Sequence, residues 1–169
     1  MRRTFLTTSA RHLASIVLLP FVVVVVVPSW LLNSWAEVDY RWSGRVPVLA
    51  GRALGLLICV AGLLLFIWCV ALFARVGHGT LAPWDPTKRL VAVGPYRHIR
   101  NPMISAVAAL LLGEALYFGS AILAGWSMLF IAVNHVYFLL SEEPGLERRF
   151  GAAYVDYKRS VPRWLPRAK

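Results

Sequence analysis

The chain has 169 residues, of which 59% are hydrophobic and only 15% are charged, and its mean hydropathy is +0.63. Soluble domains carry roughly 25% charged residues, so this composition indicates a membrane protein. It excludes disordered, collagen-like and disulfide-scaffold classes, because the chain has only 12 Gly, 10 Pro and 2 Cys. The length is that of one compact unit, and we expect a single membrane domain over residues 1–169.

Uncharged stretches predict the spanning helices, since about 20 apolar residues cross a bilayer as a helix. The first two stretches cover residues 13–32 and 53–74. A third, from Asn101 to Ser141, is long enough for two helices, which we place at 103–118 and 121–141. The intervening Tyr117–Ser120 segment contains a glycine and predicts a tight turn. We therefore predict an all-α, polytopic membrane protein with about four transmembrane helices.

Beyond Pro144 the pattern changes to apolar residues at helical spacing among charged ones. This pattern predicts one C-terminal amphipathic helix at the membrane interface, with Trp164 as a later anchor. Its apolar positions are Leu146, Phe150, Tyr154 and Tyr157.

The distribution of Lys and Arg predicts the orientation. With four spans, 15 of the 18 cations fall on one face, and Arg41, Arg45 and Arg52 fall on the other. The positive-inside rule then places both termini in the cytoplasm, and we expect a multi-pass protein of a bacterial inner membrane. The net charge of +10 thus reflects orientation and contact with anionic headgroups rather than nucleic-acid binding. Arg2-Arg3 resembles an export signal, but further apolar sequence follows, which favours a membrane anchor.

The two cysteines, Cys59 and Cys69, lie in the same predicted span, about 15 Å apart along a helix. They cannot form a disulfide at that separation, and packing is their expected role. No metal-ligand spacing surrounds them, and we expect no metal site.

Polar residues gather in the cytoplasmic loop 75–102, which ends with Arg100-Asn101-Pro102. Pro102 suits the first turn of the third span, and Asn101 suits its N-cap. Arg100 and Asn101 would then stand at a helix N-terminus, which favours an anion. The alternative is a loop that contacts lipid headgroups and ends in an ordinary cap.

A second polar group closes the fourth span. The adjacent carboxylates of Glu142 and Glu143 lie on the cation-rich face, and they require a partner or a ligand. His135 precedes Glu142 by seven residues, which places both on nearly the same face of a regular helix. Polar groups inside a span are functional candidates, although a structural hydrogen bond to a neighbouring helix explains His135 equally well.

The order of these motifs resembles the isoprenylcysteine carboxyl methyltransferases and the related phospholipid N-methyltransferases. The similarity covers residues 75–166, which we treat as the family-like region containing the cytoplasmic loop 75–102 and the tail 142–169. It rests on GPYRHIRNPM from Gly94 to Met103, on the EEPGL segment from Glu142, and on the later residues Phe150, Gly151, Tyr154, Tyr157, Val161 and Pro162. Asn101 and Ile104 depart from the prenylcysteine enzymes, in which His and Tyr are usual at these places.

The resemblance implies S-adenosylmethionine as cofactor, bound on the cytoplasmic side between the last two spans and the C-terminal segment. Carboxylates suit the ammonium and ribose hydroxyls of this cofactor, and cations or N–H donors suit its carboxylate. The residues assigned to cofactor binding are Gly77, Gly79, Tyr96, His98, Arg100, Pro102, Glu142 and Glu143. Those assigned to catalysis are Arg100, Asn101 and His135, with His135 or His98 able to deprotonate an amine acceptor.

We therefore expect a membrane methyltransferase whose partners are membrane lipids and a hydrophobic or lipidated acceptor that enters between helices. Three alternatives stay open: a prenylcysteine-type carboxylate, a phospholipid or other amine, and a non-catalytic membrane protein of the same fold. Each enzyme alternative depends on Arg100 lying beside Glu142 and Glu143.

Overall fold

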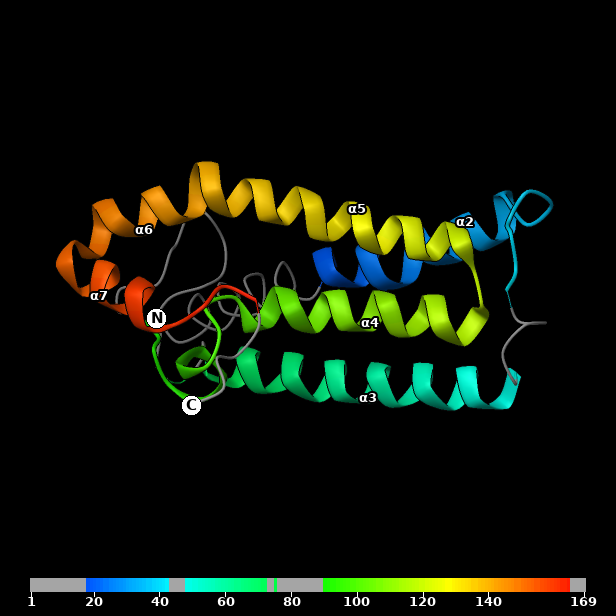
Figure 1. Cartoon of the computed structure of the whole chain (residues 1–169), viewed down its shortest axis with the longest axis horizontal. Helices are drawn as coiled ribbons and strands as arrows, with labels where there is room; N and C mark the ends of the chain where they lie inside the picture. The colour runs from blue at the N-terminus through cyan, green and yellow to red at the C-terminus, as the bar shows by residue number, and fades with distance from the viewer. Residues whose placement is uncertain (1–17, 43–47, 73–74, 76–89, 165–169) are drawn as a thin grey trace, which may run out of the picture.

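The chain is all-helical in the residues that the computed structural model describes, which are 18–42, 48–72, 75 and 90–164. Helix α3 packs on α4, α4 on α5, and α2 on α5, so the long helices run alongside one another (Figure 1). Helices α6 and α7 extend beyond one end of this bundle. The elements are η1 (Val22–Val26), α2 (Val27–Ser34), α3 (Val48–Leu72), η3 (Gly94–Arg97), α4 (Pro102–Phe118), α5 (Ala121–Tyr137), η4 (Phe138–Glu142), α6 (Glu143–Phe150) and α7 (Ala152–Ser160).

Two helices of the described chain are long and apolar enough to cross a membrane. They are α3, with 25 residues, and the continuous helix Ala121–Phe150, with 30 residues. The apolar helices Leu18–Ser34 and Pro102–Phe118 are shorter. The 17 residues of α4 rise only about 26 Å, against about 30 Å of hydrocarbon. Two of the four expected spans thus have the required length within the described residues, which begin at Leu18 and so contain only part of the first span.

The surface of α3 distinguishes it from the core helix of a soluble protein. Only 17% of its apolar window is buried inside the molecule. Leu49, Leu57 and Leu64 are each more than 60% exposed. An apolar surface of this extent requires a lipid environment or a partner to cover it.

Small residues let α3 and α4 approach closely. A Cβ added at Gly55 would lie 2.6 Å from the carbonyl oxygen of Gly113, and one at Gly62 would lie 2.9 Å from that of Ala106. Cβ atoms essentially never approach other atoms this closely. Because small residues allow such backbone contact between apolar helices, they fix the register of this pair.

Wide helical turns precede two prolines in the structure. The N–H of Val27 bonds to the carbonyl of Val22, just before Pro28, and the N–H of Glu143 bonds to that of Phe138, just before Pro144. A proline inside a regular helix loses a hydrogen bond and clashes with the carbonyl four residues earlier. The wider turns change the register of the backbone at both places, so the helix continues instead of breaking.

The C-terminal amphipathic stretch differs from the single helix expected. It is divided at Gly151 into α6 and α7, where the backbone has φ 55° and ψ −133°. Side chains strongly disfavour this conformation, which glycine adopts readily. The break turns α7 back toward the beginning of α4 (Figure 1).

The chain turns between α4 and α5 at Gly119 and Ser120. Gly119 has φ 62°, in the left-handed region, and the Ser120 hydroxyl accepts the N–H of Leu123 to cap α5. Asp39, from the loop after α2, reinforces this turn: its carboxylate accepts the Ser120 hydroxyl at 2.7 Å and the Ile122 N–H at 3.1 Å. The loop is thereby attached to the end of the bundle opposite α6 and α7.

Candidate functional site

The chain after α7 folds across the N-terminus of α4. The backbone N–H of Arg100 donates to the carbonyl of Pro162 at 2.9 Å, and the Tyr157 hydroxyl donates to the carbonyl of Tyr96 at 2.6 Å. Burial raises the pKa of Tyr157, so this hydroxyl keeps its proton and remains a donor. These bonds join two segments that are about 60 residues apart in sequence.

Glu143 is the centre of this region. Its side chain is only 5% exposed and faces three cations. Oε1 lies 2.9 Å from Arg100 Nη1 and 2.8 Å from Arg163 Nε, and Oε2 lies 3.3 Å from Lys158 Nζ. The acid thus connects the start of α4, the end of α7 and the segment that follows.

Arg100 forms an ion pair with Glu143, but two of its nitrogens have no hydrogen-bond acceptor in suitable geometry among the described residues. Its side chain is 10% exposed, and neither Nε nor Nη1 makes a hydrogen bond within the described chain. The contact with Glu143 is therefore an ion pair without hydrogen-bond geometry. A buried guanidinium with free N–H groups is able to receive a carboxylate or another anion.

Glu142 lies beside this ion pair and repels Glu143 electrostatically. Unlike Glu143, it forms no hydrogen bond or ion pair with any described residue. Tyr154 is buried in the same region, and burial raises the pKa of its hydroxyl, which therefore keeps its proton. A carboxylate without a partner and a guanidinium edge without an acceptor are thus close together, which suits a ligand that carries both charges.

His135 is engaged by the C-terminal segment. Trp164 Nε1 donates to His135 Nδ1 at 3.1 Å, and the two rings stack at 6.3 Å. The Trp164 ring also packs on buried Phe138, at 5.6 Å. When Nδ1 accepts a hydrogen bond in a neutral imidazole, the proton resides on Nε2. His135 thus has no free basic nitrogen while Trp164 occupies this position.

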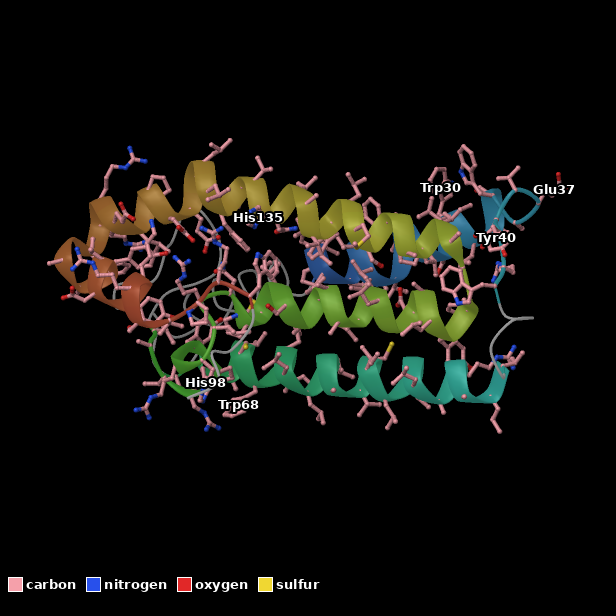
Figure 2. All side chains as sticks on the ribbon, in the orientation of Figure 1. Trp30, Glu37, Tyr40, Trp68, His98 and His135 are labelled. Atoms are coloured by element: carbon pink, nitrogen blue, oxygen red, sulfur yellow. The ribbon has the colours of Figure 1, made fainter. Side chains whose placement is uncertain are left out.

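His98 lies apart from the acid pair. It is exposed and, together with Arg97, borders a hollow of about 480 Å³ beside Leu65 and Trp68 of α3. Figure 2 shows His98 near Trp68 on the α3 side of the molecule, whereas His135 lies on the α5 side. The structure therefore brings Arg100 and His135 to the C-terminal segment but leaves His98 outside this group.

The remaining predicted residues occupy varied positions. Tyr96 is buried with Cys69 and Met103, and Pro102 is fully buried at the start of α4. Asn101 occupies the N-cap position, although its side chain makes no capping hydrogen bond, and its carbonyl accepts the Ser105 hydroxyl. Gly77 and Gly79 lie outside the described residues.

Sequence reasoning did not assign Lys158, Arg163 or Trp164 to this region. The available signal was electrostatic: two adjacent acids require nearby cations, and the tail is rich in them. Charge alone does not predict which tail cations contact Glu143, because those contacts depend on the break between helices at Gly151. No group of three His, Cys, Asp or Glu side chains with metal-binding geometry occurs in the described part of the chain.

Comparison with known proteins identifies the family. The chain matches the family model for phospholipid methyltransferases over residues 50–153, which include most of α3 and all of α4, α5 and α6. No curated protein matches the sequence. The match covers more than half of the 169 residues and contains Arg100, His135 and both acids. Family membership and the two long apolar helices together support a membrane methyltransferase. This chain therefore belongs to the phospholipid methyltransferase family.

Proposed function

We propose that this protein is an integral membrane methyltransferase that uses S-adenosylmethionine to methylate a lipid. One observation carries the proposal: Arg100 Nε and Nη1, which lack a hydrogen-bond acceptor, lie in the same cluster as Glu142, whose carboxylate has no partner among the described residues. Buried Glu143 contacts Arg100 and holds it at one end of an apolar bundle. Family membership supports the reaction class.

The residues of this cluster fit the charges of the cofactor. The free N–H groups of Arg100 would receive its carboxylate, and Glu142 would receive its ammonium or ribose hydroxyls. When bound, the cofactor supplies an electrophilic methyl group on a positively charged sulfur. Methyl transfer depends on alignment and exclusion of water more than on acid–base chemistry, and a buried cluster favours both.

Glu143 has a different role from Glu142 in this proposal. It contacts Arg100, Arg163 and Lys158, so its charge is already compensated. Because Arg100 and Glu143 are in direct contact, the ligand would bind beside this pair rather than between its members. Glu143 then acts as a positioning residue that orients Arg100.

The acceptor enters from the bilayer in this proposal, and family membership favours a phospholipid amine over a prenylcysteine carboxylate. A protonated amine must lose a proton before it can attack a methyl group. His135 Nδ1 would be available for this task only after Trp164 leaves it. Displacement of Trp164 by the bound acceptor would make the base available only when substrate is present.

The proposed topology retains four membrane helices with both termini in the cytoplasm of a bacterial cell. Helix α7 carries Lys158 and Arg159 and would lie along the cytoplasmic headgroups. Helix α4, although short, is covered by α3 and α5 and can cross a locally thinned bilayer.

Calorimetric titration with S-adenosylhomocysteine tests the cofactor site. Glu142→Gln and Arg100→Gln should each weaken binding about tenfold or more, because each removes one charged partner of the ligand. Glu37→Gln is the matched control, since Glu37 is an exposed acid at the opposite end of the molecule (Figure 2). Unchanged affinity in both site variants, with intact thermal unfolding, would refute the site.

The acceptor is identified by incubating membranes with cofactor that carries a labelled methyl group. Label in the headgroup of an aminophospholipid supports the N-methyl assignment, and label as a base-labile ester supports a prenylcysteine-type carboxylate. Cofactor binding without labelling of any extract would favour the non-catalytic alternative.

A further inference from the structure

A second hollow lies at the opposite end of the bundle from Glu143. It has a volume of about 380 Å³ and lies where the loop after α2 meets the start of α3 and the end of α4. No residue of the Arg100–Glu143 cluster lines it. The side chains that matter for its chemistry are Arg41, Trp42, Arg52, Leu54, Tyr117 and Phe118.

Arg41 is held in place by Asp39 and by the backbone of Phe118. Its Nε lies 2.8 Å from Asp39 Oδ2, and its Nη1 donates to the carbonyl of Phe118 at 3.1 Å. The Asp39 side chain is 1% exposed and is itself held by Ser120 and Ile122. Two of the three guanidinium nitrogens are thus occupied, and Nη2 has no partner in the described chain. The side chain is 37% exposed, so this free edge is accessible.

Arg52 is the second cation of the hollow. It is the only charged residue of α3, it is exposed, and it forms no ion pair or hydrogen bond with the described residues. Cations are disfavoured on the side of a membrane protein opposite its basic face. Two of the three cations on that side nevertheless line one hollow, which indicates a shared anionic ligand.

The other walls are apolar and aromatic. Leu54 faces the hollow from α3, and Tyr117 and Phe118 contribute from α4, with their rings 5.1 Å apart at nearly a right angle. Trp42 and Tyr117 are residue types that favour the membrane–water interface. A ligand with an anionic head and an apolar tail matches this combination of walls.

We propose that this hollow binds an anionic glycerophospholipid in the leaflet opposite the methyl-transfer site. Its phosphate would lie between Arg41 Nη2 and Arg52, and an acyl chain would follow the surface of α3 past Leu54. The inference rests on the membrane placement in the proposed function but not on its methyl-transfer chemistry. The bound lipid would stabilise the contact between the loop after α2 and the α3–α4 pair.

Native mass spectrometry of the detergent-purified protein with added phosphatidylglycerol tests this site. The wild type should retain phosphatidylglycerol in preference to zwitterionic phosphatidylcholine. Arg52→Gln should weaken retention about fivefold, the effect of about one cation near an anionic lipid. Arg52→Lys should keep most of it, because the charge remains. Arg159→Gln, which removes a cation that is 78% exposed at the other end, is the control and should change retention much less than Arg52→Gln, because Arg159 does not line the hollow of the lipid site.

Equal retention in the wild type and Arg52→Gln, or equal retention of both lipids by the wild type, would overturn the lipid site. Titration with S-adenosylhomocysteine on the same samples separates this result from the methyltransferase proposal. If lipid retention depends on Arg52 but S-adenosylhomocysteine does not bind, the lipid site is supported and the cofactor site is refuted. If S-adenosylhomocysteine binds but phosphatidylglycerol is not retained selectively, the cofactor site is supported and the lipid site is refuted.

Discussion

The two ends of the bundle are each organised around a buried acid, Asp39 at one end and Glu143 at the other. The side chain of Asp39 is 1% exposed and that of Glu143 is 5% exposed. Asp39 contacts one cation, one hydroxyl and one backbone N–H, and these partners satisfy both of its oxygens. Among the described residues, Glu143 contacts three cations, and its neighbourhood includes Arg100 nitrogens without an acceptor and Glu142 without a partner.

This difference is what we expect between a structural acid and an acid of the proposed cofactor site. A buried polar group normally finds its partners within the protein, so a cluster that lacks some of them is a candidate for binding. At the Asp39 end, the carboxylate oxygens join the loop after α2 to the start of α5. At the Glu143 end, the groups left over are those that a zwitterionic ligand would complete.

The largest effect is expected from Glu143→Gln. This change leaves buried Arg100 and Arg163 without their shared negative charge, and the loss of one partner of a buried ion pair costs about 3–5 kcal/mol. Thermal unfolding in detergent should shift strongly downward, and S-adenosylhomocysteine should no longer bind. A variant with wild-type unfolding would show that the cations are not held by Glu143.

Asp39→Asn should have an intermediate effect on stability and should leave the cofactor site unchanged. The variant loses the charge that fixes Arg41, and hydrogen bonds to charged groups contribute about 2 kcal/mol. Because Asp39 is remote from Arg100, the affinity for S-adenosylhomocysteine should match that of the wild type. A large loss of affinity would show that the two ends are coupled and that the division between structural and binding acid is wrong.

Ser120→Ala should cost about 1 kcal/mol, since it removes the N-cap of α5 and one donor to Asp39. Hydrogen exchange should increase in the first turn of α5, at Ile122 and Leu123, and remain unchanged in α6. Increased exchange in α6 would contradict a local role for this cap.

The approach of Arg100 to the acid pair follows from the sequence. The third uncharged stretch is long enough for two helices, and a tight turn makes them antiparallel, so the start of one lies beside the end of the other. Arg100 and Glu143 occupy those two places and are in contact in the structure. The resemblance to the methyltransferase family also follows from the ordered motifs, and the family match confirms it.

The partner of each side chain does not follow from the sequence. The seven-residue spacing of His135 and Glu142 assumes a regular helix, but the wide turn at Phe138–Glu142 changes the rotation between them. His135 consequently contacts Trp164, which lies 29 residues away. Lys158 and Arg163 reach Glu143 because the backbone reverses at Gly151. Helical periodicity in the sequence does not predict this reversal.

The smallest effect on stability is expected from Lys158→Met, which tests whether an exposed cation at the Glu143 end stabilises the fold less than a buried one. Lys158 is 39% exposed and bridges Glu143 and Glu147, whereas Arg100 is 10% exposed. An exposed ion pair contributes about 1 kcal/mol or less, so the temperature of thermal unfolding should shift only slightly.

The pH dependence of this small effect provides a second test. The hydrogen bond with Glu147 raises the pKa of Lys158, so the stabilisation by the ion pair is complete at neutral pH. It is lost only as the pH rises through that raised value, and unfolding of the wild type and Lys158→Met should therefore converge at strongly alkaline pH. A difference that instead grows with pH would show that Lys158 is not charged against these acids.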